Sequence, residues 1–100
     1  MKRSDKKIIV LDLTDCKSVQ ELQERIKEDF GFPDFYGKNW DAFWDLLWSD
    51  CDADRVEIIG EHTLPDEFNA SLKKLHEILQ FNSDEHANYD WEPFDYEIID

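Results

Sequence analysis

Three short apolar runs lie along the chain, and each predicts a β-strand. The first, Lys7–Leu13, is apolar at almost every position, which is typical of a strand covered on both faces. Arg55–Gly60 is the second run, and Phe94–Ile99 alternates toward a third strand. We therefore expect a sheet of three strands joined by long connections.

A first helix is expected between the first two strands. Apolar residues fall three or four positions apart over Val19–Phe30, which is the spacing of one helix face. Ser18 and Glu21 have the spacing of a capping box at its start. Gly31 provides a stop, because glycine readily adopts the left-handed backbone that ends a helix.

Two further helices follow. Phe32–Asn39 is expected to be a loop, after which Asn39 caps a short helix over Trp40–Trp48. Pro65 suits the first turn of a third helix. The polar and acidic residues Asn82–Pro93 are expected to form a loop before the last strand. The third helix has an apolar stripe made by Phe68, Leu72, Leu75 and Leu79.

The element order is strand, helix, helix, strand, helix, strand. Helical crossovers between strands imply a parallel sheet with right-handed connections. The 100 residues suit one domain. We expect a single small α/β domain, residues 1–100, with a three-stranded parallel sheet packed with three to four helices.

The formal net charge of −14 is concentrated in the later part of the chain. Residues 1–30 carry seven basic and seven acidic side chains, whereas residues 31–100 carry four basic and eighteen acidic ones. Such a field repels nucleic acids and anionic membranes and attracts basic proteins. The expected partner is therefore a basic protein, with no nucleic acid and no membrane.

The cellular compartment is expected to be the cytoplasm. No signal peptide is visible, and no apolar run reaches the length of a membrane span. Cys16 and Cys51 are therefore expected to be reduced thiols.

The second helix has two contrasting faces on a helical wheel. Phe43, Leu46 and Leu47 fall together and predict a core face. The opposite side brings Asp41 and Asp45 together, four residues apart, without a lysine to offset their repulsion. That side also carries tryptophans at positions 44 and 48.

Residues 32–54 contain seven aromatic residues and six aspartates but only one cation, Lys38. So short a helix is not expected to bury both the tryptophan stripe and the core face. Exposed apolar area rimmed by charge marks interaction sites, and tryptophan and tyrosine dominate interface energetics. We therefore predict a surface that binds a protein. The expected contact residues on this helix are Trp40, Asp41, Trp44, Asp45 and Trp48.

The segment Phe32–Asp45 reads Phe-Pro-Asp-Phe-Tyr-Gly-Lys-Asn-Trp-Asp-Ala-Phe-Trp-Asp. It resembles the signature of the barstar family, the intracellular inhibitors of the ribonuclease barnase. The resemblance implies a three-stranded parallel sheet with helices and no catalytic residues or cofactor. It also implies that this loop and helix plug a nuclease active site, which adds Phe35, Tyr36 and Asn39 to the expected partner-binding residues.

By the same resemblance, Asp45 enters the phosphate pocket of the nuclease, and Asp41 pairs with a neighbouring cation. Phe35 and Trp44 pack on the rim of that pocket. The resemblance gives Trp40 an apolar contact, whereas Tyr36, Gly37 and Asn39 hold the shape of the loop. Carboxylates and aromatic faces suit such a site, because it is built to bind phosphates and bases.

An enzyme is a rival interpretation of the two aspartates. Asp41 and Asp45 have the chemistry of a general acid/base pair or of metal ligands. No histidine, lysine or arginine lies beside them in the sequence, however, and the acidic field opposes a phosphodiester substrate. We therefore expect a protein that is not an enzyme.

The sequence gives little indication of a metal-binding site. Asp50, Asp52 and Asp54 begin like a calcium loop with Glu61 in twelfth place, but Arg55 stands where that loop needs glycine. These aspartates are thus expected to strengthen the negative electrostatic field of the protein rather than to bind a metal ion. Zinc-ligand spacing is absent among the remaining candidates, which are Cys16, Cys51, His62, His76 and His86.

The expected function is stoichiometric inhibition, of the immunity or antitoxin type, of a cognate basic ribonuclease of secreted or toxin type. A monomer that forms a 1:1 heterodimer is expected. The alternative is an acidic binding module that neutralises a toxin other than a ribonuclease or engages another basic protein.

Overall fold

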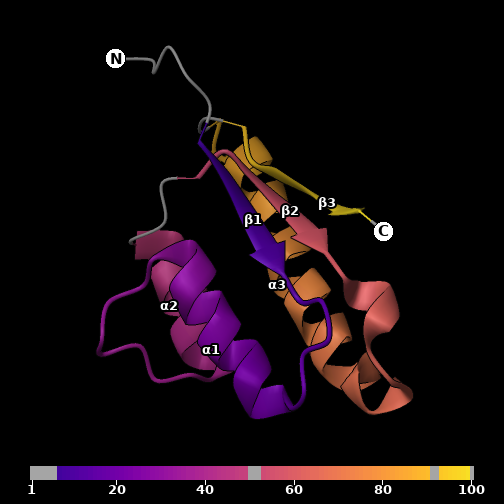
Figure 1. Ribbon diagram of the computed structural model, residues 1–100. Helices are drawn as coiled ribbons and strands as arrows, with labels where there is room; N and C mark the ends of the chain where they lie inside the picture. Colours follow the sequence, from indigo (N-terminus) through magenta and orange to yellow (C-terminus); the bar gives the residue numbers. More distant parts are fainter. Residues whose placement is uncertain (1–6, 50–52, 91–92, 100) are drawn as a thin grey trace.

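The computed structural model describes residues 7–49, 53–90 and 93–99. Its sheet has the order β1-β2-β3, and both pairings are parallel. The expected α/β class, sheet and element order are confirmed, with two short 3-10 turns added between β2 and α3 (Figure 1). The elements are β1 Ile8–Asp12, α1 Val19–Phe30, α2 Trp40–Ser49, β2 Arg55–Ile59, η1 Glu61–Thr63, η2 Asp66–Phe68, α3 Asn69–Asn88 and β3 Asp95–Ile99.

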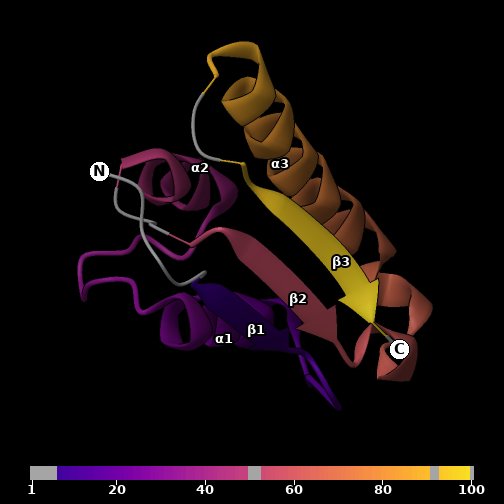
Figure 2. The same ribbon diagram turned by 90° about the horizontal axis from the view of Figure 1, so that it is seen from above.

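The helices cover only one face of the sheet (Figures 1 and 2). In β1, Ile9 and Leu11 are buried, whereas Ile8 and Val10 are 48% and 46% exposed. The prediction that this strand is covered on both faces is therefore wrong. The strands follow one another across the sheet in chain order, and right-handed crossovers that step in one direction keep every helix on the same side.

Charged side chains of β2 and β3 occupy the open face of the sheet. Arg55 forms an ion pair with Glu57 at 3.0 Å and with Asp95 at 3.1 Å, and it also pairs with Glu97. The hydrogen bonds that Arg55 donates to these carboxylates raise the pKa of its guanidinium. A parallel sheet usually needs cover on both faces, and here a solvated ion network takes the place of a second layer.

Helix α3 is longer than the sequence pattern predicts. It continues through Asn82 to Asn88, although the sequence predicts a loop over Asn82–Pro93. Asn82 is buried, and the Ser83 hydroxyl donates to the backbone carbonyl of Phe94 at 2.8 Å. Tertiary contacts thus hold polar residues in a helix although their intrinsic propensity for it is low.

The core lies between the sheet and the helices. Its largest fully buried side chains are Phe43 of α2 and Phe68, which precedes α3. The stripe of α3 is confirmed at Leu75 and Leu79, which are completely buried, while Leu72 packs at the edge of the core. This packing fixes α2 against α3.

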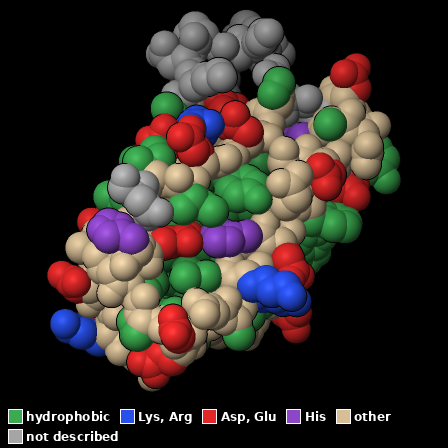
Figure 3. Space-filling view, turned by 90° about the vertical axis from the view of Figure 1, so that its right-hand side faces the viewer, with side chains coloured by type: hydrophobic (Ala, Val, Ile, Leu, Met, Phe, Trp, Pro, Cys, Tyr) green, Lys and Arg blue, Asp and Glu red, His purple; other side chains and the backbone are tan. Residues whose placement is uncertain are grey.

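The surface on the β3 side is seen in Figure 3. Hydrophobic side chains form a band across this face, and acidic side chains are scattered around it. Within the described ranges, no helix combines the length and the apolar character needed to cross a membrane.

Candidate functional site

The loop between α1 and α2 is anchored where α1 ends. Ser18 caps the start of that helix, and Gly31 ends it in the left-handed conformation with φ 70°. The Phe32 N–H donates to the carbonyl of Lys27 at 3.0 Å, and the Phe32 ring is buried. The loop therefore leaves the core from a defined point.

Tyr36 supports the loop from inside. Its ring is 4% exposed, and its hydroxyl donates to Oε1 of Gln23, which is also buried. Burial raises the pKa of the Tyr36 hydroxyl above its ordinary value. The structure thus places this predicted contact residue behind the surface, in the shape-holding position that the family resemblance implies.

Phe35 lies at the outer edge of the same loop. Its side chain is 78% exposed, the largest exposed fraction among the large hydrophobic residues described. Neighbouring charges tie the loop to α1, since Lys27 pairs with Asp34 at 3.2 Å and Lys38 lies 3.9 Å from Glu24. A large apolar ring is therefore presented to solvent by a loop with fixed ends.

Asn39 caps α2, as the sequence predicts. Its Oδ1 accepts from the Ala42 N–H at 2.8 Å, and its Nδ2 donates to the Gly37 carbonyl at 3.2 Å. Lys38 takes the left-handed conformation, with φ 54°, to make the turn. The amide side chain thus joins the end of the loop to the first turn of the helix.

The two faces of α2 are arranged as the helical wheel predicts. Phe43, Leu46 and Leu47 are buried in the core. Asp41 and Asp45 are exposed on the outer side. Asp41 belongs to the first turn, where a carboxylate is favoured by the helix dipole. The helix therefore presents two carboxylates from a rigid support.

The tryptophan stripe is only partly exposed. Trp48 is 44% exposed, whereas Trp40 and Trp44 are half-buried and pack against the core. The helix thus buries its core face but not the whole tryptophan stripe, and within the stripe Trp40 and Trp44 are more covered than Trp48. The cause is α3, which lies alongside α2 and covers one side of Trp40 and Trp44.

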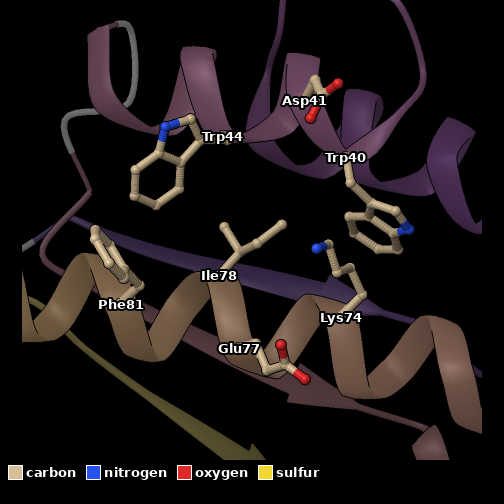
Figure 4. A pocket seen from close by; sticks show the side chains of 7 residues that line it. All are labelled: Trp40, Asp41, Trp44, Lys74, Glu77, Ile78 and Phe81. Carbon is tan, nitrogen blue, oxygen red and sulfur yellow. The ribbon is translucent and has the colours of Figure 1, made fainter.

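A groove of about 270 Å³ separates α2 from α3 (Figure 4). From α2 it is lined by Trp40, Asp41 and Trp44. From α3 it is lined by Lys74, Glu77, Ile78 and Phe81. Trp44 and Phe81 meet edge to face, with ring centroids 4.7 Å apart.

Sequence reasoning missed the α3 side of this site. In particular, Lys74 lines the same groove as Asp41, although it is 33 positions away from Asp41 in the sequence. The one available signal was Phe81, an aromatic residue that follows the apolar stripe of α3 without belonging to it. Only the packing of α3 against α2 brings these residues to the site.

The surface as a whole carries carboxylates and aromatic rings on a rigid backbone. Such a surface can bind cationic groups through charge-assisted hydrogen bonds and can cover apolar area with its rings. We call the exposed or half-exposed predicted contacts the α2 surface, which consists of Phe35, Asn39, Trp40, Asp41, Trp44, Asp45 and Trp48.

The metal-binding alternatives gain no support. In residues 7–49, 53–90 and 93–99, no three His, Cys, Asp or Glu side chains are grouped so as to hold a metal ion. His76 instead forms a close pair with Glu61, Nε2 to Oε2 2.6 Å. Asp50, Asp52 and Cys51 lie outside the described residues.

Two comparisons with known proteins bear on this site. The family described as Barstar (barnase inhibitor) matches residues 6–97. A protein of Bacillus subtilis (strain 168) named "Putative ribonuclease inhibitor YrdF" is 41% identical over 39 residues. Those residues are 39% of this chain and 43% of that protein, so the match spans less than half of either.

Proposed function

The chain belongs to the barstar family, and on this premise we propose that it binds one cognate, basic ribonuclease and blocks its active site in a 1:1 complex. Membership supports a role of the ribonuclease-inhibitor type and a protein partner. We further propose that the chain acts as an immunity protein or antitoxin in the cytoplasm of the cell that makes the nuclease.

One observation carries the proposal beyond the family. The α2 surface combines exposed carboxylates with exposed aromatic rings on elements that are fixed from behind by Phe32, Tyr36 and Phe43. An inhibitor needs such a rigid surface, because side chains already held in place lose little entropy on binding. A flexible acidic tail would attract the same partner but would not exclude substrate.

The two carboxylates have separate roles in this proposal. Asp45 enters the phosphate-binding pocket of the ribonuclease and forms charge-assisted hydrogen bonds with its cations. Asp41, one helical turn earlier, pairs with a cation at the rim. Phe35 and Trp48, the most exposed rings of the α2 surface, cover the surrounding apolar area.

The direct test is inhibition at equal concentrations. Purified chain is mixed with barnase, and with basic ribonucleases recovered by affinity capture from the source cell, and the cleavage of RNA is measured. The proposal expects cleavage of at least one of these enzymes to stop at a molar ratio near one. If every captured partner is basic but none is a ribonuclease, the alternative holds instead: the chain neutralises a toxin other than a ribonuclease or engages another basic protein.

Replacing Asp45 by alanine should weaken the complex by about 3–5 kcal/mol, because the partner keeps a buried cation without its counter-charge. Asp66→Ala is the matched control: it removes the same charge from an exposed position on η2, away from the α2 surface. It should leave the dissociation constant nearly unchanged. Equal affinities for the two variants would reject the role given to Asp45.

A further inference from the structure

The groove between α2 and α3 has two chemically different ends (Figure 4). Trp44, Phe81 and Ile78 form one end, which is entirely apolar. The other end carries Trp40 and Lys74, with Asp41 at the rim. The two ends should therefore favour different parts of a bound surface.

The apolar end keeps aromatic area open to solvent. Phe81 is 49% exposed although it contacts Trp44, and Ile78 closes the floor as a buried residue. Trp48 continues the same aromatic group, since its ring centroid lies 6.0 Å from that of Trp44. Rings exposed side by side on two helices form a patch of the kind that binds a partner.

The other end already contains a cation. The Lys74 side chain extends into the groove, and its ammonium lies between Ile78 and Trp40 in Figure 4. A second cation entering here would meet that ammonium, although Asp41 and Glu77 stand nearby. This end of the groove thus differs from the exposed carboxylate of Asp45, which is not among the residues that line the groove with Lys74.

We propose that this groove receives a large apolar side chain, aromatic by preference, from the protein that binds the α2 surface. The partner is then a basic protein whose surface places one such side chain beside its cationic cluster. A second copy of this chain is a poor occupant, because two molecules with a net charge of −14 repel each other. The inference rests on the proposed function only for the identity of the partner as a ribonuclease.

The groove would act as a determinant of specificity. Carboxylates on α2 suit any cationic site, so they do not by themselves distinguish one basic partner from another. An apolar end of defined shape does, since a charged or polar side chain placed there would lose its hydration without a hydrogen-bond partner. Partners with a polar residue at this point should bind less tightly.

Small probes test the chemistry of the groove without any partner. Indole stands in for an aromatic side chain and ethylguanidinium for an arginine side chain. Each is titrated into the labelled chain while the indole N–H signals of Trp40 and Trp44 are followed by NMR. The expected result is that indole shifts the Trp44 signal at concentrations where ethylguanidinium does not.

Phe81→Ala should abolish the response to indole, while Phe81→Leu should retain part of it. Tyr89→Ala is the control, because it removes an exposed aromatic ring from the end of α3 outside the groove. Three results would overturn the proposal. These are a stronger response to ethylguanidinium, no response to indole, or self-association of the free chain that Phe81→Ala removes.

Affinity for the inhibited ribonuclease separates this inference from the proposed function. Phe81→Ala should raise the dissociation constant on the order of tenfold, whereas Tyr89→Ala should not change it. A chain that binds indole in the groove but inhibits no ribonuclease contradicts the proposed function alone. A chain that inhibits with unchanged affinity after Phe81→Ala contradicts the groove alone.

Discussion

At the scale of residues, two neighbouring aromatic side chains of one loop differ in their exposure to solvent. Phe35 is 78% exposed, while Tyr36 is 4% exposed. The difference follows from Gln23, which offers the Tyr36 hydroxyl a buried hydrogen-bond partner. A tyrosine is buried at little cost when its polar atom is satisfied, and it then fixes the loop that carries Phe35.

Tyr36→Phe should lower the free energy of unfolding by about 1–3 kcal/mol, because the Gln23 side chain loses its buried donor. Chemical denaturation at neutral pH measures the loss. Tyr89→Phe, which changes an exposed tyrosine in the same way, should alter stability by less than about 0.5 kcal/mol. Equal stability of Tyr36→Phe and the parent chain would contradict the structural role of this hydroxyl.

The stability contributed by Tyr36 should also depend on pH. Burial raises the pKa of its hydroxyl, so the folded chain holds this proton more tightly than the unfolded chain does. The contribution is therefore complete below about pH 10, the ordinary pKa of tyrosine, and is lost as pH rises above it. Denaturation curves above about pH 10 should lose stability more steeply for the parent chain than for Tyr36→Phe.

At the scale of elements, α2 depends on its surroundings. A helix of ten residues is not stable alone, and this one lacks a basic residue in its last turn. The cap by Asn39 and the burial of Phe43 and Leu47 hold it in place. Its exposed carboxylates can therefore be arranged for binding rather than for the stability of the helix itself.

Asn39→Ala should cost about 1 kcal/mol of stability, because the first turn of α2 loses its side-chain acceptor. It should also weaken inhibition, since Asp41 lies in that turn. Asn39→Asp keeps an acceptor for the Ala42 N–H and should recover most of the stability in denaturant unfolding. If both variants were equally unstable, the hydrogen bond from Asn39 to Gly37 would be the dominant contact instead.

At the scale of the whole molecule, the sheet and the buried core support the α2 surface from behind. All three helices lie on one face of the sheet, and the loop before α2 projects beside them (Figure 1). The chain as a whole carries a net charge of −14 and therefore a negative electrostatic field. Such a field raises the rate of encounter with a basic partner.

Association with the ribonuclease should therefore depend strongly on salt. Between about 0.01 M and about 1 M ionic strength the Debye length falls from about 30 Å to about 3 Å. The association rate constant should fall at least about tenfold over this range, while the dissociation rate constant changes far less. Stopped-flow mixing measures both rate constants. An association rate constant that does not change with salt concentration would contradict electrostatic steering.

Much of the fold followed from local rules. The N-cap at Ser18, the stop at Gly31 and the cap at Asn39 each depend on a few adjacent residues, so the sequence predicts them correctly. The element order then implied the parallel sheet. Most residues of the α2 surface follow from the same reasoning, because helical periodicity alone separates Asp41 and Asp45 from the core face.

The errors share a different cause. An apolar run does not reveal that the crossovers leave one face of β1 open, and a polar run does not reveal that Asn82 is buried. The partial burial of Trp40 and Trp44 and the place of Lys74 in the groove depend on α3, which is distant in the sequence.

The sequence by itself thus determined the order of the strands and α-helices, the family resemblance and the acidic, aromatic character of the α2 surface, since these depend on short-range spacing and composition. Only the tertiary structure decided which rings remain exposed and that α2 and α3 enclose a groove. The physical reason is that exposure and enclosure arise from contacts between elements, and those contacts exist only after the helices have packed on one face of the sheet.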